Sequence, residues 1–202
     1  MILKMQKNKG EYKIMKNATK VVTSKKVRFS YANLLAPKSP VEGAEPVYSV
    51  SLIISKDDTY TLDKVKAAIQ AAYEEGANKL KGNGKVVPPF ASLRPVLRDG
   101  DIDKAGDEAY KNSYFINAKS KTKPGIVDAA CNPILNPEEE IYSGMYGRAS
   151  INFYCYNTGM SKGIACGLNN VQKIADGERL GGRASAESDF KDEDDGEDDF
   201  LE

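Results

Sequence analysis

Residues 146–156, YGRASINFYCY, decide the fold class of this 202-residue chain. Small or apolar residues occupy the odd positions from Gly147 to Cys155, and polar or tyrosine residues occupy the even positions. Successive side chains of a β-strand point to opposite faces of a sheet, so the alternation predicts a strand with one face in a core. The other face would lie at or near solvent and would carry Tyr146, Arg148, Ser150, Asn152, Tyr154 and Tyr156.

Four further stretches have strand-like patterns: residues 19–31, 47–55, 113–119 and 162–172. In the first of them, Val27, Phe29 and Tyr31 are expected on one face of the sheet. In the third, Tyr114 and Phe115 point to opposite faces. The sequence leaves open which of these two rings meets the core.

Residues 62–80 have apolar side chains at helical spacing, and Thr61 is the expected N-cap of this helix. Residues 81–112, rich in Gly and Pro, are expected to form a long loop, and such loops are usually functional or mobile. Strands at irregular spacing together with one main helix predict a mainly β fold. A small β-barrel and a sandwich both fit this pattern.

The composition argues against several classes of enzyme. The chain has no histidine, which excludes Ser-His-Asp and Cys-His catalysis and histidine-ligated metals, although carboxylate chemistry stays open. Cys131, Cys155 and Cys166 are an odd number with no close pair, so free thiols are expected rather than disulfides or a zinc site. No apolar run is long enough to span a membrane. We therefore expect a non-enzymatic protein with no cofactor and no metal.

Charge is divided unevenly along the chain, although its 29 bases and 29 acids balance. Residues 187–202 contain ten acids and one base, which leaves 28 bases and 19 acids in residues 1–186. The body therefore carries about +9 (28 minus 19) and the tail about −9 (1 minus 10). Such asymmetry indicates a nucleic-acid or membrane partner, or an interaction tail.

Both ends are expected to lie outside the folded domain, which we place at residues 15–180. Residues 1–14 show no clear periodicity and are predicted to be a disordered basic arm, or an upstream segment that precedes a translation start at Met15. Residues 181–202 are predicted to be a disordered acidic tail. This tail can mimic a nucleic-acid backbone or bind a partner, or can serve only as a solubilising segment. The residues that would act are Asp192, Glu193, Asp194, Asp195, Asp198, Asp199 and Phe200.

The aromatic and basic residues of the body predict a nucleic-acid site. Aromatic rings stack on bases, and Lys or Arg side chains neutralise phosphates. The polar face of residues 146–156 offers both groups, and residues 113–123 add an aromatic ring and three lysines. A second core, or contact with another protein, would equally explain the tyrosines. The predicted nucleic-acid-binding residues are Arg94, Arg98, Phe115, Lys119, Lys121, Lys123, Tyr146, Arg148, Tyr154 and Tyr156.

Five runs, in one order along the chain, carry a family resemblance: residues 114–121 (YFINAKSK), 142–144 (YSG), 148–154 (RASINFY), 167–173 (GLNNVQK) and 181–183 (GGR). They resemble a bacteriophage and prophage family of single-stranded DNA-binding proteins that was formerly a domain of unknown function. The resemblance extends over residues 15–200. The family is similar to the single-stranded DNA-binding proteins of short-tailed coliphages.

The resemblance implies an OB-fold-like β-barrel with one main helix, elaborated loops and an acidic C-terminal tail. It implies a protein that coats single-stranded DNA during phage replication and recombination, in the cytoplasm of a bacterial host. Through the tail, it implies competition with DNA and contact with phage or host replication and recombination proteins. No catalytic residue is implied.

Two features depart from the family pattern. The tail ends in Phe200-Leu201-Glu202 rather than in a terminal Phe. The predicted helix follows the second strand-like run, whereas a simple OB-fold carries its helix after the third strand, so an undetected strand or an elaborated barrel is expected. A single-strand annealing protein, a structural β-domain that does not bind DNA, and a homodimer stay open as alternatives.

Overall fold

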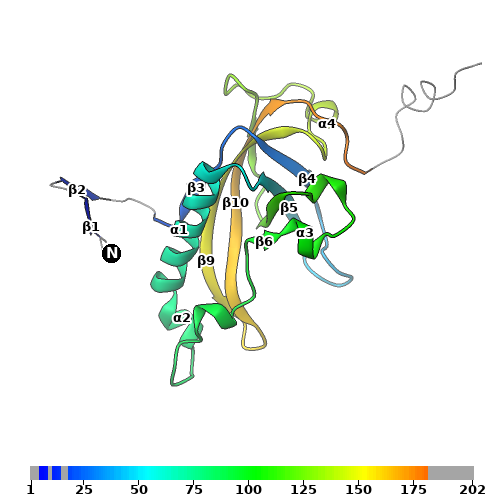
Figure 1. Cartoon of the computed structure of the whole chain (residues 1–202). Helices are drawn as coiled ribbons and strands as arrows, with labels where there is room; N and C mark the ends of the chain where they lie inside the picture. Colours follow the sequence, from blue (N-terminus) through cyan, green and yellow to red (C-terminus); the bar gives the residue numbers. More distant parts are fainter. Residues whose placement is uncertain (1–4, 9–10, 15–17, 182–202) are drawn as a thin grey trace, which may run out of the picture.

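The computed structural model describes residues 5–8, 11–14 and 18–181 of the chain. Strands β1 (Met5–Asn8) and β2 (Glu11–Ile14) pair with each other in an antiparallel hairpin. The remaining strands join one eight-stranded sheet, beside one long helix (Figure 1). Among the helices of the described ranges, none has the length and apolar composition that a membrane crossing requires.

Five strands of this sheet pair in a closed ring. In ring order they are β4 (Val27–Lys38), β5 (Val47–Ser55), β7 (Ser113–Ser120), β10 (Lys162–Ala175) and β9 (Tyr146–Asn157), and β9 pairs back to β4. Within the ring, β7 and β10 are parallel and every other pair is antiparallel. A sheet closed on itself is a barrel, and a five-stranded barrel of this kind confirms the expected mainly β, OB-fold-like architecture.

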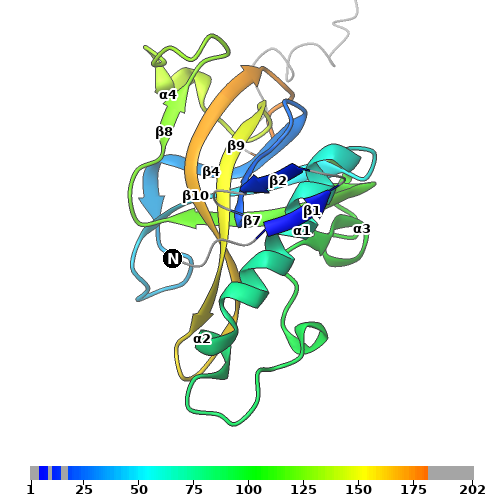
Figure 2. The same ribbon diagram turned by 90° about the vertical axis from the view of Figure 1, so that its left-hand side faces the viewer.

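Three short strands extend the sheet beyond the ring. β3 (Lys20–Val22) pairs with β9, β8 (Gly125–Val127) pairs with β10, and β6 (Arg98–Asp99) pairs with β7. Figure 2 shows β9 and β10 as long, curved strands that run side by side. Because β3 and β8 flank them, the outer surface of this hairpin is wider than two strands.

The predicted helix is two helices, α1 (Thr59–Glu75) and α2 (Ala77–Lys81), which meet at Gly76. A Cβ atom on Gly76 would lie 2.4 Å from the Cβ and Sγ atoms of Cys155, so glycine alone lets the chain approach β9 this closely. Helix α1 follows β5, the second strand of the ring, and the strand before the ring, β3, pairs with β9 outside it. The barrel is therefore elaborated, and among the described residues no further ring strand precedes the helix.

The prediction that Thr61 caps this helix was wrong. The N-cap is Asp58, whose carboxylate accepts a hydrogen bond of 3.1 Å from the backbone N–H of Thr61. The Thr61 side chain is buried and accepts a hydrogen bond of 3.0 Å from the backbone N–H of Ser24. Asp58 also accepts a hydrogen bond of 2.6 Å from the Ser24 hydroxyl, so the cap ties α1 to the segment between β3 and β4.

The predicted strand at residues 19–31 is two strands, β3 and β4, separated by a turn at residues 25–26. Val27 and Phe29 share one face as predicted, and both side chains are buried in the core. Tyr31 does not share this face: its side chain is 59% exposed, its φ is +47°, and the pairing register of β4 with β5 shifts directly after Ser30. This local bulge turns Tyr31 away from the face that strict alternation predicts.

The predicted loop at residues 81–112 contains β6 and three short helical turns: η1 (Phe90–Ser92), α3 (Gly100–Asp103) and η2 (Glu108–Tyr110). A further short helix, α4 (Pro137–Glu140), lies between β8 and β9. The Tyr110 ring packs edge-on against Phe115 and beside Ile53, in a small cluster separate from the main core. The segment from β6 to η2 thus covers the outer face of β5 and β7 where Ile53 and Phe115 lie.

Candidate nucleic-acid interface

The alternation predicted for residues 146–156 is confirmed in β9. Ala149, Ile151 and Phe153 are buried in the main core. The even positions are half-buried or exposed, and Tyr154 is 44% exposed. The strand therefore presents an arginine, an asparagine and tyrosine rings on its outer side.

The residues of β10 that lie across from this outer side are small. Their register is Gly163 opposite Tyr156, Ala165 opposite Tyr154, and Gly167 opposite Asn152. An added Cβ on Gly163 would lie 3.2 Å from a ring carbon of Tyr156, so this ring lies directly against the backbone of β10. On the β10 side, the tyrosines thus have no bulky cross-strand neighbour among the described residues. We call this surface the β9–β10 face, and its residues are Arg148, Ser150, Asn152, Tyr154, Tyr156, Gly163, Ala165 and Gly167.

The predicted lysines lie beside the β9–β10 face. Lys119 of β7 is exposed and is the register partner of Gly167. Lys121 and Lys123 are exposed in the connection between β7 and β8. Lys121 forms an ion pair with Glu45, and the hydrogen bond and charge of this carboxylate raise the pKa of the lysine. The structure therefore places Lys119 beside the β9–β10 face, and Lys121 and Lys123 follow it in the connection to β8, which pairs with β10.

Arg148 is held in place by the chain segment that follows β3. Its Nε atom donates a hydrogen bond of 3.1 Å to the carbonyl oxygen of Thr23. The buried Thr23 hydroxyl accepts a hydrogen bond of 3.0 Å from the Ala149 backbone N–H, which fixes that segment against β9. Nearby, the hydrogen bond from Lys64 lowers the pKa of Tyr60, and the charge of Arg148 contributes in the same direction. Cations thus cluster where α1 begins.

Tyr146, at the start of β9, is partly covered. The guanidinium of Arg28 lies 5.7 Å from the centre of its ring. A Cβ on Gly177 would lie 2.7 Å from a carbon of the same ring, so the chain after β10 passes close over it. Tyr146 therefore offers less free ring surface than Tyr154.

The structure does not place Phe115 or Arg98 on this face. Phe115 is 1% exposed and packs against Tyr110 and Ile53, so its ring has no surface for a base. The guanidinium of Arg98 lies 4.8 Å from the centre of the Phe115 ring, and its Nε donates to Asp103 at 3.1 Å. Both predicted residues are engaged in holding the β6–η2 segment on the barrel, and we leave them out of the interface.

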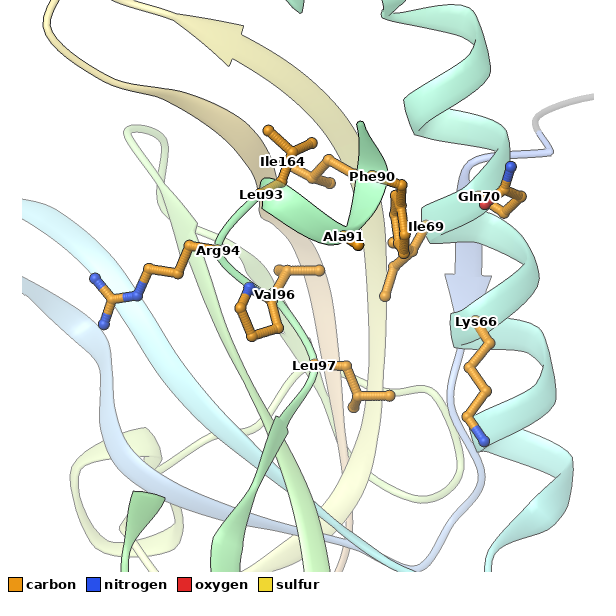
Figure 3. A pocket seen from close by; sticks show the side chains of 11 residues that line it. Lys66, Ile69, Gln70, Phe90, Ala91, Leu93, Arg94, Val96, Leu97 and Ile164 are labelled. Carbon is orange, nitrogen blue, oxygen red and sulfur yellow. The ribbon is translucent and has the colours of Figure 1, made fainter. Parts of the chain in front are cut away.

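Arg94 lies at a different surface. It lines an apolar pocket of about 490 Å³ between α1 and residues 90–97, together with Ile69, Phe90 and Ile164 (Figure 3). The Arg94 side chain points away from the apolar side chains of this pocket. Its guanidinium is exposed and available to a phosphate, but from outside the β9–β10 face.

Lys20 is a further neighbour of this face, which the sequence pattern did not predict. Lys20 is exposed on β3 and is the register partner of Asn152. No local pattern could have found it, because the pairing joins residues more than a hundred positions apart. The predicted tail residues, Asp192 to Asp195, Asp198, Asp199 and Phe200, lie outside the described residues.

The thiols and carboxylates of the described part of the chain form no group of three or more that could hold a metal ion. Burial raises the pKa of the Cys166 and Cys155 thiols, so both favour the neutral form. The β9–β10 face offers aromatic rings, an amide side chain and cations. These groups suit the binding of a polyanion with flat bases better than they suit catalysis.

Comparison with known proteins gives one family and several solved structures. Residues 19–201 match the family described as the ssDNA-binding protein of Enterobacter phage Enc34. Protein p50 of Acyrthosiphon pisum secondary endosymbiont phage 1 is 28% identical over 168 residues, which cover 80% of this chain and 88% of that protein.

The structure is similar to that of the single-stranded DNA-binding protein from bacteriophage Enc34 in complex with ssDNA. The TM-score is 0.66 and the identity 26%, over 89% of this chain and 98% of that one. It also shares its fold with gp2.5, a single-stranded DNA-binding protein encoded by bacteriophage T7. There the TM-score is 0.56 and the identity 17%, over 87% of this chain and 96% of that one.

Proposed function

The chain belongs to the phage Enc34 family of single-stranded DNA-binding proteins, and from this membership we propose that it coats single-stranded DNA during phage replication and recombination in the host cell. The observation that carries the proposal is the composition of the β9–β10 face. Two tyrosine rings lie over small residues, with an ordered arginine at one end and lysines along one side.

The rings supply affinity that does not depend on sequence. Every base has a flat face, and stacking on an aromatic side chain contributes about 1–3 kcal/mol per base. Tyr154 and Tyr156 alternate with core residues on one strand and so present their rings on the same side of the sheet. The face offers few donors and acceptors arranged for one particular base, so we expect little sequence preference.

The cations supply the electrostatic part of binding. Arg148, Lys119, Lys121 and Lys123 would each neutralise phosphates along a strand that lies on the β9–β10 face, and each neutralised phosphate releases counterions. The role needs no reacting group, and we propose a binding protein without catalytic activity.

The acidic tail would act on the same surface. Residues 187–202 carry ten acidic side chains and the rest of the chain has the opposite net charge, so the tail would compete with DNA for the cations and would be displaced when DNA binds. Freed in this way, its Phe200 and neighbouring acids would be available to replication or recombination proteins.

The test is a salt-titrated binding assay that compares single-stranded DNA, duplex DNA and RNA. We expect tight, salt-dependent retention of single-stranded DNA and much weaker retention of the duplex, whose bases are not free to stack. Equal affinity for single strands and duplex would contradict the stacking mechanism. Absence of salt-dependent retention would contradict the function itself.

A further inference from the structure

Tyr31 has an unusual combination of exposure and backbone conformation. Its φ of +47° lies in the left-handed region, which residues other than Gly, Asn and Asp rarely adopt. Its side chain is 59% exposed, so packing of the ring does not compensate for the strain. An unfavourable conformation that gains nothing from burial is a reason to look for a function.

Lys104 lies over this ring. Its Nζ atom is 5.1 Å from the ring centre of Tyr31 and donates to the phenol oxygen at 3.4 Å. The same Nζ lies 5.4 Å from the ring centre of Tyr110. The backbone of Tyr31 is also fixed by Asn33. The Asn33 side-chain amide donates one hydrogen bond of 3.2 Å to the Tyr31 carbonyl oxygen and another of 3.1 Å to the Ser49 hydroxyl. An exposed ring with an ordered cation beside it matches the pair of groups that one nucleotide requires.

An unbroken row of register partners connects this site to the β9–β10 face. Across five strands of the ring the partners are Asn33, Ser49, Lys119, Gly167 and Asn152. Each of these residues is half-buried or exposed, and none is acidic or large and apolar. Four steps between neighbouring strands, at about 4.8 Å each, place the two ends of the row about 19 Å apart along the sheet.

We propose that Tyr31 and Lys104 form a second base-stacking subsite for single-stranded DNA, which a strand reaches by crossing this row from the β9–β10 face. The inference rests on the proposed function and extends it. Tyr31 takes the face of one base, Lys104 takes an adjacent phosphate, and Lys119 in the middle of the row contacts the backbone between the two tyrosine sites.

The first test separates the ring from the backbone strain. In Tyr31→Gly the left-handed conformation costs nothing, so the variant should resist urea at least as well as the wild type. Its affinity for a 16-nucleotide single strand should fall at least about five-fold, because one stacked base is lost. Tyr31→Phe keeps the ring and should bind as the wild type does. Asn112→Gly, at another residue with positive φ (+48°), is the matched control and should leave DNA binding unchanged.

The second test uses the length of the DNA. OB-folds occupy about 4–16 nucleotides, so a strand of about four nucleotides can occupy the β9–β10 face alone. Tyr31→Gly should weaken the long strand and leave the short one unaffected, whereas Tyr154→Ala should weaken both. Lys104→Ala should lower the salt slope for the long strand by about 0.7, which corresponds to one phosphate contact.

Three results would overturn the subsite. They are unchanged affinity of Tyr31→Gly for the long strand, an equal loss on both lengths, and a loss of binding that is matched by a loss of stability. If the wild type itself fails to retain either strand, the proposed function fails instead, so the two failures are distinguishable.

Discussion

The ring of Tyr156 lies against the backbone of Gly163, its register partner on β10, so closely that an added Cβ would lie 3.1 Å from the phenol oxygen. The ring can take this position because Gly163 has no side chain opposite it. Tyr156 is half-buried in this arrangement, and we expect a base to stack on the part of the ring that stays exposed.

Gly163→Val should displace the Tyr156 ring and weaken single-stranded DNA binding as much as Tyr156→Ala does. The slope of log affinity against log salt should not change, because no cation is removed. Equilibrium binding at several salt concentrations measures both quantities. Tyr156→Phe, which loses only the contact with the Ser161 hydroxyl, is the control and should bind normally. A folded Gly163→Val variant with wild-type affinity would remove Tyr156 from the interface.

Arg148→Ala combined with Tyr154→Ala should weaken binding through two separable effects. Loss of one stacked base should cost about 1–3 kcal/mol, and loss of one phosphate contact should lower the salt slope by about 0.7. Lys111→Ala removes an exposed cation that is paired with Glu108 on η2, and it should change neither quantity. Unchanged affinity in the double variant would show that DNA does not use the β9–β10 face.

Deletion of residues 187–202 should tighten DNA binding at low salt, since on the proposed function it removes ten carboxylates that would compete with DNA for the same cations. The difference between the full-length and shortened proteins should shrink as salt rises, because screening weakens both the tail and the DNA contacts. Phe200→Ala keeps every charge of the tail and should leave DNA affinity unchanged. If deletion has no effect at low salt, the tail serves partners or solubility alone.

The three cysteines should differ in reactivity. Cys131 is exposed, whereas Cys155 and Cys166 are buried and have raised thiol pKa values. The thiolate is the reactive form, so a thiol reagent should modify one cysteine rapidly in the native protein and all three in denaturant. Cys131→Ser should abolish the rapid reaction. Fast modification of two or three thiols in the native state would contradict the burial of β9 and β10.

The cap at Asp58 should make stability depend on pH. Burial alone would raise the pKa of this carboxyl, but the hydrogen bonds from Ser24 and Thr61 outweigh burial and lower it. The ionised form therefore stabilises the folded state above the ordinary Asp pKa, and this contribution is lost as pH falls through the lower pKa of the folded protein. Asp58→Ala should cost about 0.5–2 kcal/mol of unfolding free energy at pH 7.

Urea unfolding of the wild type and of Asp58→Ala at pH 7 and pH 3 measures this cap. The gap between the two should narrow at the lower pH. Asp57→Ala, next to the cap and exposed, is the matched control and should cost little at either pH. A gap that stays constant with pH would mean that the charge of Asp58 contributes nothing.

The local alternation of β9 was sufficient to predict which of its residues are buried, because a strand with one face in a core repeats every two residues. The same rule failed at Tyr31, where a positive φ interrupts the repeat, and no residue type in the sequence marks that position. The helix prediction failed at Gly76 for a related reason. The break depends on close approach to Cys155, which is far away in the sequence.

The candidate site was predictable only in part. Arg148, Tyr154 and the lysines after β7 needed no knowledge beyond strand alternation and chain order. Phe115 could not be placed, since its burial depends on how residues 98–110 fold back over β7. The row that joins Asn33 to Asn152 is a property of strand order in the ring, and one sequence does not reveal which distant strands are neighbours.

The closed ring also sets the order in which the protein can fold. The hairpin of β9 and β10 joins neighbouring segments, but the ring closes where Val27 meets Gly147, residues 120 positions apart (147 minus 27). Contacts this distant form late, because the entropy of closing the loop is paid before the contact is gained. During synthesis β4, β5 and β7 leave the ribosome well before β9 and β10 can complete the barrel, and their unpaired edges are sites of aggregation in the interval. A chain cut short before residue 162 would therefore lose more than its last strand, since without β10 no strand joins β7 to β9 and the barrel could not close.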